Sequence, residues 1–189
     1  MQMRKLVAQT FITLDGVMEA PDKWQFPNEL FGDDAAAYCL DAYETAGGLL
    51  LGRVTYEEFA GFWPTQGDDD PFAKRINELP KYVVTRTLKA LAWGPAEAIN
   101  EIPAGVAKLK DGNGGDVLIV GSAQVVNGLA EAGLIDEYQL FVHPIIVGRG
   151  KRLFDPGLAP TLYTLTETKT FGTGIVVLTY RYKGKAALG

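Results

Sequence analysis

The chain has 189 residues, of which 47% are hydrophobic and 22% are charged, and its formal net charge is −5. This is an ordinary globular composition for one domain, and no stretch approaches the ~18 uninterrupted apolar residues of a membrane span. The negative charge argues against broad binding to nucleic acids or anionic membranes, because both require a concentrated basic face.

The first predicted element is a strand over residues 6–14, which is β-rich and mostly apolar, as expected of a central strand buried on both faces. Residues 1–5 are charged like the start of a signal peptide. The strand that follows nevertheless contains polar residues and leads to no small-residue cleavage site. We therefore expect a cytoplasmic protein.

Asp15 and Gly16 end this strand, and residues 17–28 follow with two prolines, Trp24 and Phe26 but no hydrophobic period. The segment therefore predicts a long loop. Long loops with aromatic residues inside compact domains are often lids over a site. The alternative is surface cover for the edge of the core.

Two carboxylates, Asp33 and Asp34, precede an alanine-rich segment that reaches Glu44, a pattern typical of a helix start. We expect this helix to end at Gly47. The single cysteine, Cys39, lies within it and cannot form an internal disulfide or a multi-cysteine metal site. We interpret it as a small buried apolar residue.

A short apolar strand over 48–51 then meets a new helix at a glycine. This glycine lets a ligand approach closely, and the first helical turn leaves backbone N–H groups unpaired. Those donors and the helix dipole favour an anion, and an arginine and a threonine hydroxyl add to them. We predict a phosphate-binding corner, and the alternative is a plain turn with an N-capping threonine. The corner consists of Gly52, Arg53, Val54 and Thr55.

Three consecutive aspartates, residues 68–70, stand before Pro71 and predict the capped start of a helix that runs to Leu79. A metal site is the alternative interpretation of these carboxylates. No histidine or glutamate at ligand spacing accompanies them, so we expect no metal.

The next strand, over 81–85, ends in the basic, hydroxyl-bearing sequence Thr85-Arg86-Thr87. A marginal strand at 96–100 and a weak amphipathic helix at 102–111 are predicted after it. A buried strand at 116–120 then repeats the pattern of strand, glycine turn and helix, with the helix ending near residue 132. This second phosphate-type corner consists of Gly121, Ser122, Ala123 and Gln124.

The last third of the chain is β-rich. A strand over 137–142 is interrupted by His143-Pro144, and the runs 162–170 and 174–183 predict an antiparallel hairpin. We expect the tail over 185–189 to be frayed. His143, the only histidine, is a candidate general acid, but a lone histidine in a strand is more often structural.

Alternating strands and helices followed by a hairpin predict one α/β domain over 1–184, with a mainly parallel sheet and an antiparallel edge. Ligands in such sheets bind beyond the carboxyl ends of the strands. The three corners all fall there. Two helix N-termini and a basic hydroxyl pair suit a molecule with several separated phosphates.

Four segments carry a family resemblance. In order they are Thr13-Leu14-Asp15-Gly16, Leu51-Gly52-Arg53-x-Thr55, Val84-Thr85-Arg86 and Val120-Gly121-Ser122. Over residues 4–182 the chain resembles the dihydrofolate reductase superfamily, and more closely the reductase domain of bifunctional riboflavin-biosynthesis deaminase-reductases and its stand-alone bacterial relatives. The resemblance implies a dihydrofolate reductase-like three-layer α/β/α fold with a mainly parallel mixed sheet and a C-terminal antiparallel hairpin.

The resemblance also implies NADPH as the cofactor. It places Gly52 to Thr55 at the pyrophosphate, Thr85 to Thr87 at the adenosine 2′-phosphate, and Gly121 to Gln124 on the remaining phosphate and ribose. Arg53 and Arg86 independently suit a dianionic 2′-phosphate, which favours NADPH over NADH.

The implied reaction is hydride transfer to a C=N or C=O carbon of a small, pyrimidine- or pterin-like substrate. Asp15 is the candidate for proton handling, with a structural Asp-Gly turn as the alternative. Trp24 and Phe26 are expected to cover the substrate. Dihydrofolate reductases carry an acid on the first helix, and Ala36 stands near that position here, with Asp34 the neighbouring carboxylate.

Three other functions stay open: an NADPH-binding protein without turnover, a dihydrofolate reductase proper, and a plain structural dimer. The zinc-binding deaminase half of the bifunctional enzymes is missing from this sequence. We also expect a homodimer formed through residues 137–182, because the long apolar terminal strand invites cover and the resembled domains commonly pair.

Overall fold

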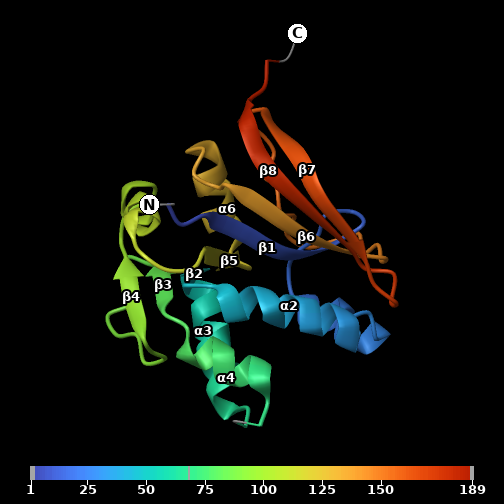
Figure 1. Cartoon of the computed structure of the whole chain (residues 1–189), viewed down its shortest axis with the longest axis horizontal. Coiled ribbons are helices and arrows are strands. Elements are labelled where there is room, and N and C mark those ends of the chain that lie inside the picture. The colour runs from blue at the N-terminus through green and yellow to red at the C-terminus, as the bar shows by residue number, and fades with distance from the viewer. Residues whose placement is uncertain (1–2, 68, 188–189) are drawn as a thin grey trace.

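One mixed β-sheet forms the centre of the structure, a computed structural model that describes residues 3–67 and 69–187 (Figure 1). Within these residues the sheet has eight strands in the order β4-β3-β2-β5-β1-β6-β8-β7. Neighbouring strands from β4 to β6 are parallel, whereas β8 runs antiparallel to both β6 and β7. The predicted parallel sheet with a C-terminal hairpin is confirmed. The strands are β1 (Leu6–Thr13), β2 (Gly48–Gly52), β3 (Lys81–Val84), β4 (Ala96–Ile99), β5 (Val117–Val120), β6 (Glu137–His143), β7 (Thr161–Thr170) and β8 (Val176–Lys185).

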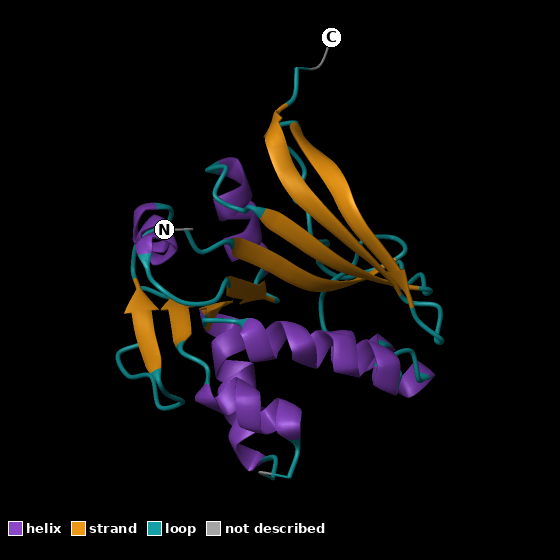
Figure 2. Ribbon diagram, viewed as in Figure 1, coloured by secondary structure: helices purple, strands orange, loops and turns teal. Residues whose placement is uncertain are grey.

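Helices cover both faces of this sheet, which gives the predicted three layers (Figure 2). Leu49 and Leu51 of β2 pack into the core beneath α2 and α4, and Leu50 packs into the core beneath α5 and α6. Successive side chains of a strand point to opposite faces, so a fully apolar strand fills both cores. The helices are α1 (Pro21–Trp24), α2 (Asp33–Thr45), α3 (Arg53–Phe62), α4 (Pro71–Glu78), α5 (Ala104–Ala107) and α6 (Ala123–Glu131), with 3₁₀ turns η1 (Phe26–Asn28), η2 (Trp63–Thr65) and η3 (Lys108–Asp111).

The segment over 17–28 differs from the predicted loop. It contains the short helix α1 and the turn η1, and Pro21 opens α1 because its fixed φ suits a first helical position. A four-residue helix is too short to display a hydrophobic period, so its pattern was absent from the sequence. The weak helix over 102–111 is likewise split into α5 and η3.

The ends of two other helices depend on single side chains. Asp70 accepts hydrogen bonds from the backbone N–H groups of Phe72 (2.8 Å) and Ala73 (3.2 Å), which confirms the predicted cap of α4. Asp68 lies outside the described residues. Arg75 of α4 donates hydrogen bonds to the carbonyl oxygens of Tyr43, Glu44 and Ala46 at the end of α2. No helix in the described part of the chain is long and apolar enough to cross a membrane.

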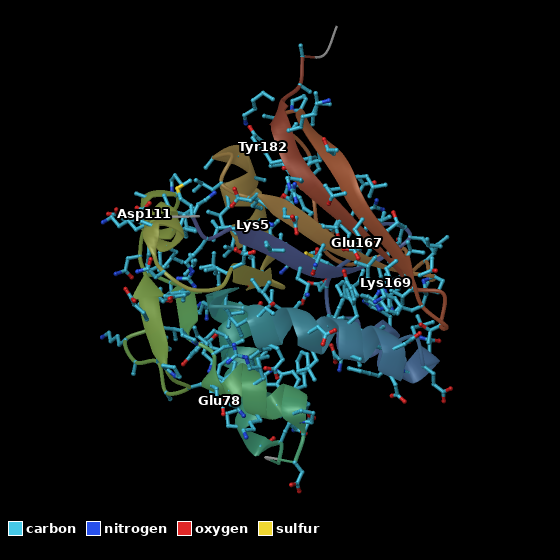
Figure 3. All side chains as sticks on the ribbon, viewed as in Figure 1. Lys5, Glu78, Asp111, Glu167, Lys169 and Tyr182 are labelled. Carbon is cyan, nitrogen blue, oxygen red and sulfur yellow. The ribbon has the colours of Figure 1, made fainter. Side chains whose placement is uncertain are left out.

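The hairpin of β7 and β8 lies at the side of the sheet opposite β4 (Figure 1). Figure 3 shows Glu167 and Lys169 on its part nearest α2 and Tyr182 toward its far end. The Lys169 ammonium lies 4.4 Å from the ring centroid of Tyr38, a residue of α2. The apolar terminal strand that was expected to need cover is β8, and it lies inside the sheet, paired with both β6 and β7. The edge strand is β7, whose Leu165 is 49% exposed.

Pairing in this hairpin continues beyond the predicted start of the frayed tail. Lys185 pairs with Thr161, and the N–H of Ala186 donates to the carbonyl of Pro160 at 2.9 Å. Lys185 thus belongs to β8, and Ala186 is held by the residue that precedes β7. Residues 188–189 lie outside the described part of the chain.

Candidate cofactor and substrate site

The first and second predicted corners meet in space. Because β2 and β5 are parallel neighbours, Gly52 and Ser122 lie together beyond their carboxyl ends. The N–H of Gly52 donates to Ser122 Oγ at 2.8 Å, and this hydroxyl donates to Thr55 Oγ1 at 3.0 Å. The two helices that start here, α3 and α6, therefore have their N-termini side by side.

Two glycines keep this corner open. Gly121 has φ +58°, and a Cβ there would lie 3.1 Å from Thr55 Oγ1. A Cβ on Gly52 would lie 3.3 Å from Ser122 Oγ. Both contacts are tight, so side chains at these positions would crowd the space in front of the two helices.

No side chain caps the first turn of either helix in the described residues, although the N–H of Val125 in α6 donates to the carbonyl of Ser122 at 2.8 Å. Gly52 and Ser122 are the N-cap residues of α3 and α6, and neither makes a side-chain cap hydrogen bond within the described structure. Free donors at two adjoining helix N-termini fit an anion with more than one phosphate. The residues present therefore fit the pyrophosphate of a dinucleotide.

The third corner lies at the end of the next strand, where Val84 of β3 pairs with Gly52. Thr85 is buried, and its Oγ1 accepts hydrogen bonds from the N–H groups of Thr87 (3.2 Å) and Leu88 (3.1 Å). This oxygen therefore shapes the turn. Arg86 and Thr87 are exposed, and Arg86 donates from Nε to the carbonyl of Asn100 at 3.3 Å, which leaves its terminal nitrogens for a ligand.

Arg53 starts α3 at the same edge of the sheet. Its guanidinium pairs with Glu57 at 3.0 Å, and both side chains are nearly half exposed. An exposed pair of this kind contributes little free energy, so a phosphate can compete for the guanidinium. Val54, the next residue, is 56% exposed in the first helical turn.

Asp15 lies at the end of β1, on the other side of β5 from the first corner. Its carboxylate accepts hydrogen bonds from Thr13 Oγ1 (2.6 Å) and from the N–H groups of Val147 (3.2 Å) and Gly148 (2.9 Å). The Thr13 hydroxyl and these N–H groups lower the pKa of Asp15 to about 2. A carboxylate with this pKa cannot supply a proton near pH 7, and its visible task is to hold the 147–152 loop against β1.

Trp24 and Phe26 behave differently, although both were predicted to cover the substrate. Trp24 is 5% exposed, donates from Nε1 to the carbonyl of Glu19 at 3.0 Å, and lies with its ring 5.0 Å from that of His143. Phe26 is 64% exposed. Trp24 is thus a buried cover at the end of β6, whereas Phe26 projects into solvent.

Asp34, the third predicted substrate residue, lies at the start of α2. Its Oδ1 accepts from the N–H of Ala35 at 2.8 Å, and its Oδ2 accepts from the N–H of Gly172 at 2.9 Å. The Gly172 bond is the main cause of a lowered pKa for Asp34. In this arrangement the carboxylate joins α2 to the turn between β7 and β8.

Two exposed apolar side chains near Asp15 were missed by the sequence analysis. Leu14 is 62% exposed and Ile146 is 71% exposed, and the N–H of Leu14 donates to the carbonyl of Ile145. They lie where the carboxyl ends of β1 and β6 meet. The available signal was the position of Leu14 between a buried strand and an Asp-Gly turn, which places it outside the core.

Two cavities lie apart from these residues. One, of about 380 Å³, lies beside the end of α2 and the amino ends of β1 and β5, and its lining includes Arg4 and Gln139. The other, of about 320 Å³, lies between α6 and β7 and is lined by aromatic residues that include Tyr138 and Tyr163. Neither is lined by a residue of the three corners.

Several known proteins are similar to this chain in sequence or in fold. The sequence model of the family described as the RibD C-terminal domain matches residues 4–177. The chain is 27% identical over 192 residues to the uncharacterized protein YyaP of Bacillus subtilis (strain 168), covering 97% of this chain and 98% of that protein.

Two solved structures have the same fold. A Shewanella sp. PV-4 protein named provisionally for riboflavin biosynthesis has a TM-score of 0.72 at 19% identity, over 95% of this chain and 99% of that one. The diaminohydroxyphosphoribosylaminopyrimidine deaminase/5-amino-6-(5-phosphoribosylamino)uracil reductase of Thermotoga maritima has a TM-score of 0.65 at 14% identity. That alignment covers 96% of this chain but 57% of the Thermotoga chain. The fold predicted from the family resemblance is confirmed.

Proposed function

The chain belongs to the RibD C-terminal domain family, and from this premise we propose that it is an NADPH-dependent reductase acting on a C=N or C=O group of a small, pyrimidine-like substrate. The observation that carries the proposal is the meeting of two helix N-termini at Gly52 and Ser122, with first-turn donors that no side chain caps. Such a corner suits a pyrophosphate.

The arginines favour the phosphorylated dinucleotide. Arg53 and Arg86 are both exposed at this edge of the sheet, and guanidinium groups bind phosphate oxygens in pairs of hydrogen bonds. NADH lacks the 2′-phosphate that would use them. We therefore expect NADPH to bind at least about tenfold more tightly than NADH, the worth of a single hydrogen bond to a charged group.

Bound NADPH would supply a hydride to the substrate. The chain's own residues would hold and enclose the reactants: Leu14 and Ile146 offer apolar contact beyond β1 and β6, and Trp24 covers the end of β6. Excluding water from such a site strengthens the electrostatic contacts within it.

A second candidate function is NADPH binding without turnover. It is favoured by Asp15, because a carboxylate with a pKa of about 2 that holds a loop is not a proton donor. Ala36, the residue near the position of the pteridine-binding acid in dihydrofolate reductases, argues only against folate as the substrate.

Two measurements test these proposals. Titration of the protein with NADPH and NADH, followed by nicotinamide fluorescence, tests the cofactor, and equal affinities would remove the 2′-phosphate assignment. Oxidation of NADPH in the presence of pyrimidine, pterin and simple carbonyl or imine compounds then tests the reaction. Binding without oxidation of NADPH by any of them would favour the second candidate.

A further inference from the structure

His143 ends β6 beside the proposed substrate site. It is the only histidine in the chain and is 0% exposed. In the parallel pairing of β1 and β6 it lies opposite Thr13, the residue whose hydroxyl donates to Asp15. This position is at the carboxyl edge of the sheet, where ligands of α/β proteins bind.

The hydrogen bonding of the ring fixes its tautomer. Nδ1 lies 2.9 Å from the carbonyl oxygen of Phe141, and a carbonyl can only accept, so Nδ1 carries the proton. Burial lowers the pKa of His143 below its ordinary value, although the carbonyls of Phe141 and Ile12 act in the opposite direction. In the neutral ring Nε2 is therefore a hydrogen-bond acceptor.

This acceptor has no partner in the described structure. Nε2 is buried and makes no hydrogen bond to any described residue. Its ring packs at right angles to those of Trp24 (5.0 Å) and Phe11 (5.6 Å), and these aromatic neighbours do not hydrogen-bond to Nε2. A buried polar atom without a partner costs folding free energy, and each one calls for an explanation. His143 Nε2 is one of eight such side-chain atoms in the described residues, and it lies at the carboxyl end of β6.

The segment that covers His143, residues 21–28, has a residue with a left-handed backbone conformation on each side of it. Trp24 belongs to α1, and the segment that contains it begins after Ala20 (φ +49°) and ends before Glu29 (φ +51°). Residues other than glycine rarely adopt these left-handed angles, and they are retained mainly where function over-determines them. Displacement of this short segment would open a path to Nε2.

We propose that His143 is a positioning residue of this site, and that its Nε2 accepts a hydrogen bond from an N–H group of the substrate. The proposal rests on the proposed reductase function and narrows its substrate class. A group that carries only acceptors cannot satisfy Nε2, so the substrate presents a hydrogen-bond donor at this point, which in the pyrimidine-like class proposed above is an amino, imino or ring N–H. Sites built around such a bond strongly reject analogues that lack the donor.

The single histidine makes a direct test possible. Protein labelled with ¹⁵N only in histidine gives one imidazole pair of resonances, which NMR can follow without assignment. In the NADPH complex at pH 7 we expect Nε2 to be unprotonated and its resonance to shift on addition of 5,6-diaminouracil. 1,3-Dimethyluracil, which has no N–H donor, should shift it much less. A protonated Nε2, or equal responses to the two compounds, would overturn the proposal.

Variants give a second readout. His143→Phe keeps an aromatic ring but removes the acceptor, whereas His143→Gln retains an acceptor oxygen. We expect His143→Phe to weaken binding of 5,6-diaminouracil to the NADPH complex by about tenfold or more, with partial recovery in His143→Gln and unchanged NADPH affinity in both. Equal binding to all three proteins would refute the role of His143.

Failure of the proposed reductase function and failure of the inference about His143 give different results. Failure of the wild-type protein to bind NADPH, seen by nicotinamide fluorescence, would contradict the reductase itself. Normal NADPH binding with a 5,6-diaminouracil affinity that does not depend on residue 143 would contradict only the inference about His143.

Discussion

The two ends of the candidate site are built in different ways. At the carboxyl ends of β2 and β5, two short motifs 70 residues apart each supply a glycine and a helix start, and one hydroxyl from Ser122 joins them into the proposed cofactor corner. At the carboxyl ends of β1 and β6, side chains meet across more than a hundred residues of chain, as when Asp15 holds Gly148. A backbone site is thus visible as a local motif, whereas a side-chain site depends on its distant partners.

The largest expected effect tests the cofactor end. Replacing Arg53 with alanine removes a guanidinium whose present partner, Glu57, is an exposed carboxylate on the same helix. We expect NADPH binding to weaken by about 1.5–3 kcal/mol, the usual worth of a hydrogen bond to a charged group, and NADH binding to change less. Fluorescence titration with both dinucleotides measures this.

The matched control for Arg53→Ala is Glu57→Ala, which frees the arginine and should leave NADPH affinity equal or higher. A lower melting temperature for Arg53→Ala together with unchanged affinity for NADPH would show that the arginine serves the fold alone.

The next effect concerns the glycine that keeps the corner open. Gly121→Ala forces an L-residue into φ +58° with its Cβ 3.1 Å from Thr55 Oγ1. We expect a loss of about 1–2 kcal/mol in unfolding free energy and weaker NADPH binding. Gly61 is the comparison, because a Cβ there meets nothing within 4 Å, and Gly61→Ala should stabilise α3 by about 0.5–1 kcal/mol. Urea unfolding of both variants checks the opposite signs.

The sequence places the proposed cofactor residues at one edge of the sheet for a physical reason, and their binding of a cofactor stays a prediction. A buried strand, a glycine and a helix start each have local signals, and parallel strands bring such turns to one edge of the sheet. These signals alone place Gly52 and Ser122 at the same edge of the sheet. The bond itself, and the use of the Thr85 hydroxyl within its own turn, depend on geometry that no local pattern contains.

The other end was predicted less well because its residues have partners far along the chain. Asp15 has the same local sequence whether it moves a proton or anchors a loop, and only the contacts with Val147 and Gly148 show the second task. Asp34 similarly meets Gly172, 138 residues later. For His143 the informative feature is a missing contact. The sequence shows a lone histidine in a strand, but it does not show that Nε2 lacks a hydrogen-bond partner.

A pH titration sharpens this view of Asp15. Its folded-state pKa of about 2 is below the ordinary 3.8, so the carboxylate stabilises the fold above pH 3.8, and this contribution is lost as the pH falls through about 2. We expect Asp15→Asn to flatten the loss of unfolding free energy between about pH 4 and pH 2. Asp34 also has a lowered pKa and acts in the same direction, so Asp34→Asn is the necessary comparison.

Thermal unfolding measured by circular dichroism at several acidic pH values supplies these data. At pH 7, hydrogen exchange of the Val147 and Gly148 amides should be faster in Asp15→Asn than in the wild type, because the amide retains one acceptor oxygen in place of two. Unchanged exchange would show that the 147–152 loop is held by other contacts.

The smallest expected effect on the site comes from the edge strand β7, which contains no residue of the three corners. We predict that the protein is a homodimer using residues 137–182, because β7 is a ten-residue edge strand whose Leu162 and Leu165 are each 49% exposed. An exposed edge of this kind tends to be buried against another chain, and two-fold dimers are the commonest assembly.

Light scattering at micromolar concentration should give twice the chain mass of 20.5 kDa, and Leu165→Glu should return it to the single-chain value. NADPH affinity should not change in this variant, because no residue of the three corners lies in the hairpin. A mass near 20.5 kDa for the wild type would exclude a stable dimer, and a loss of NADPH binding in a correctly folded Leu165→Glu protein would show that the cofactor end depends on the partner chain.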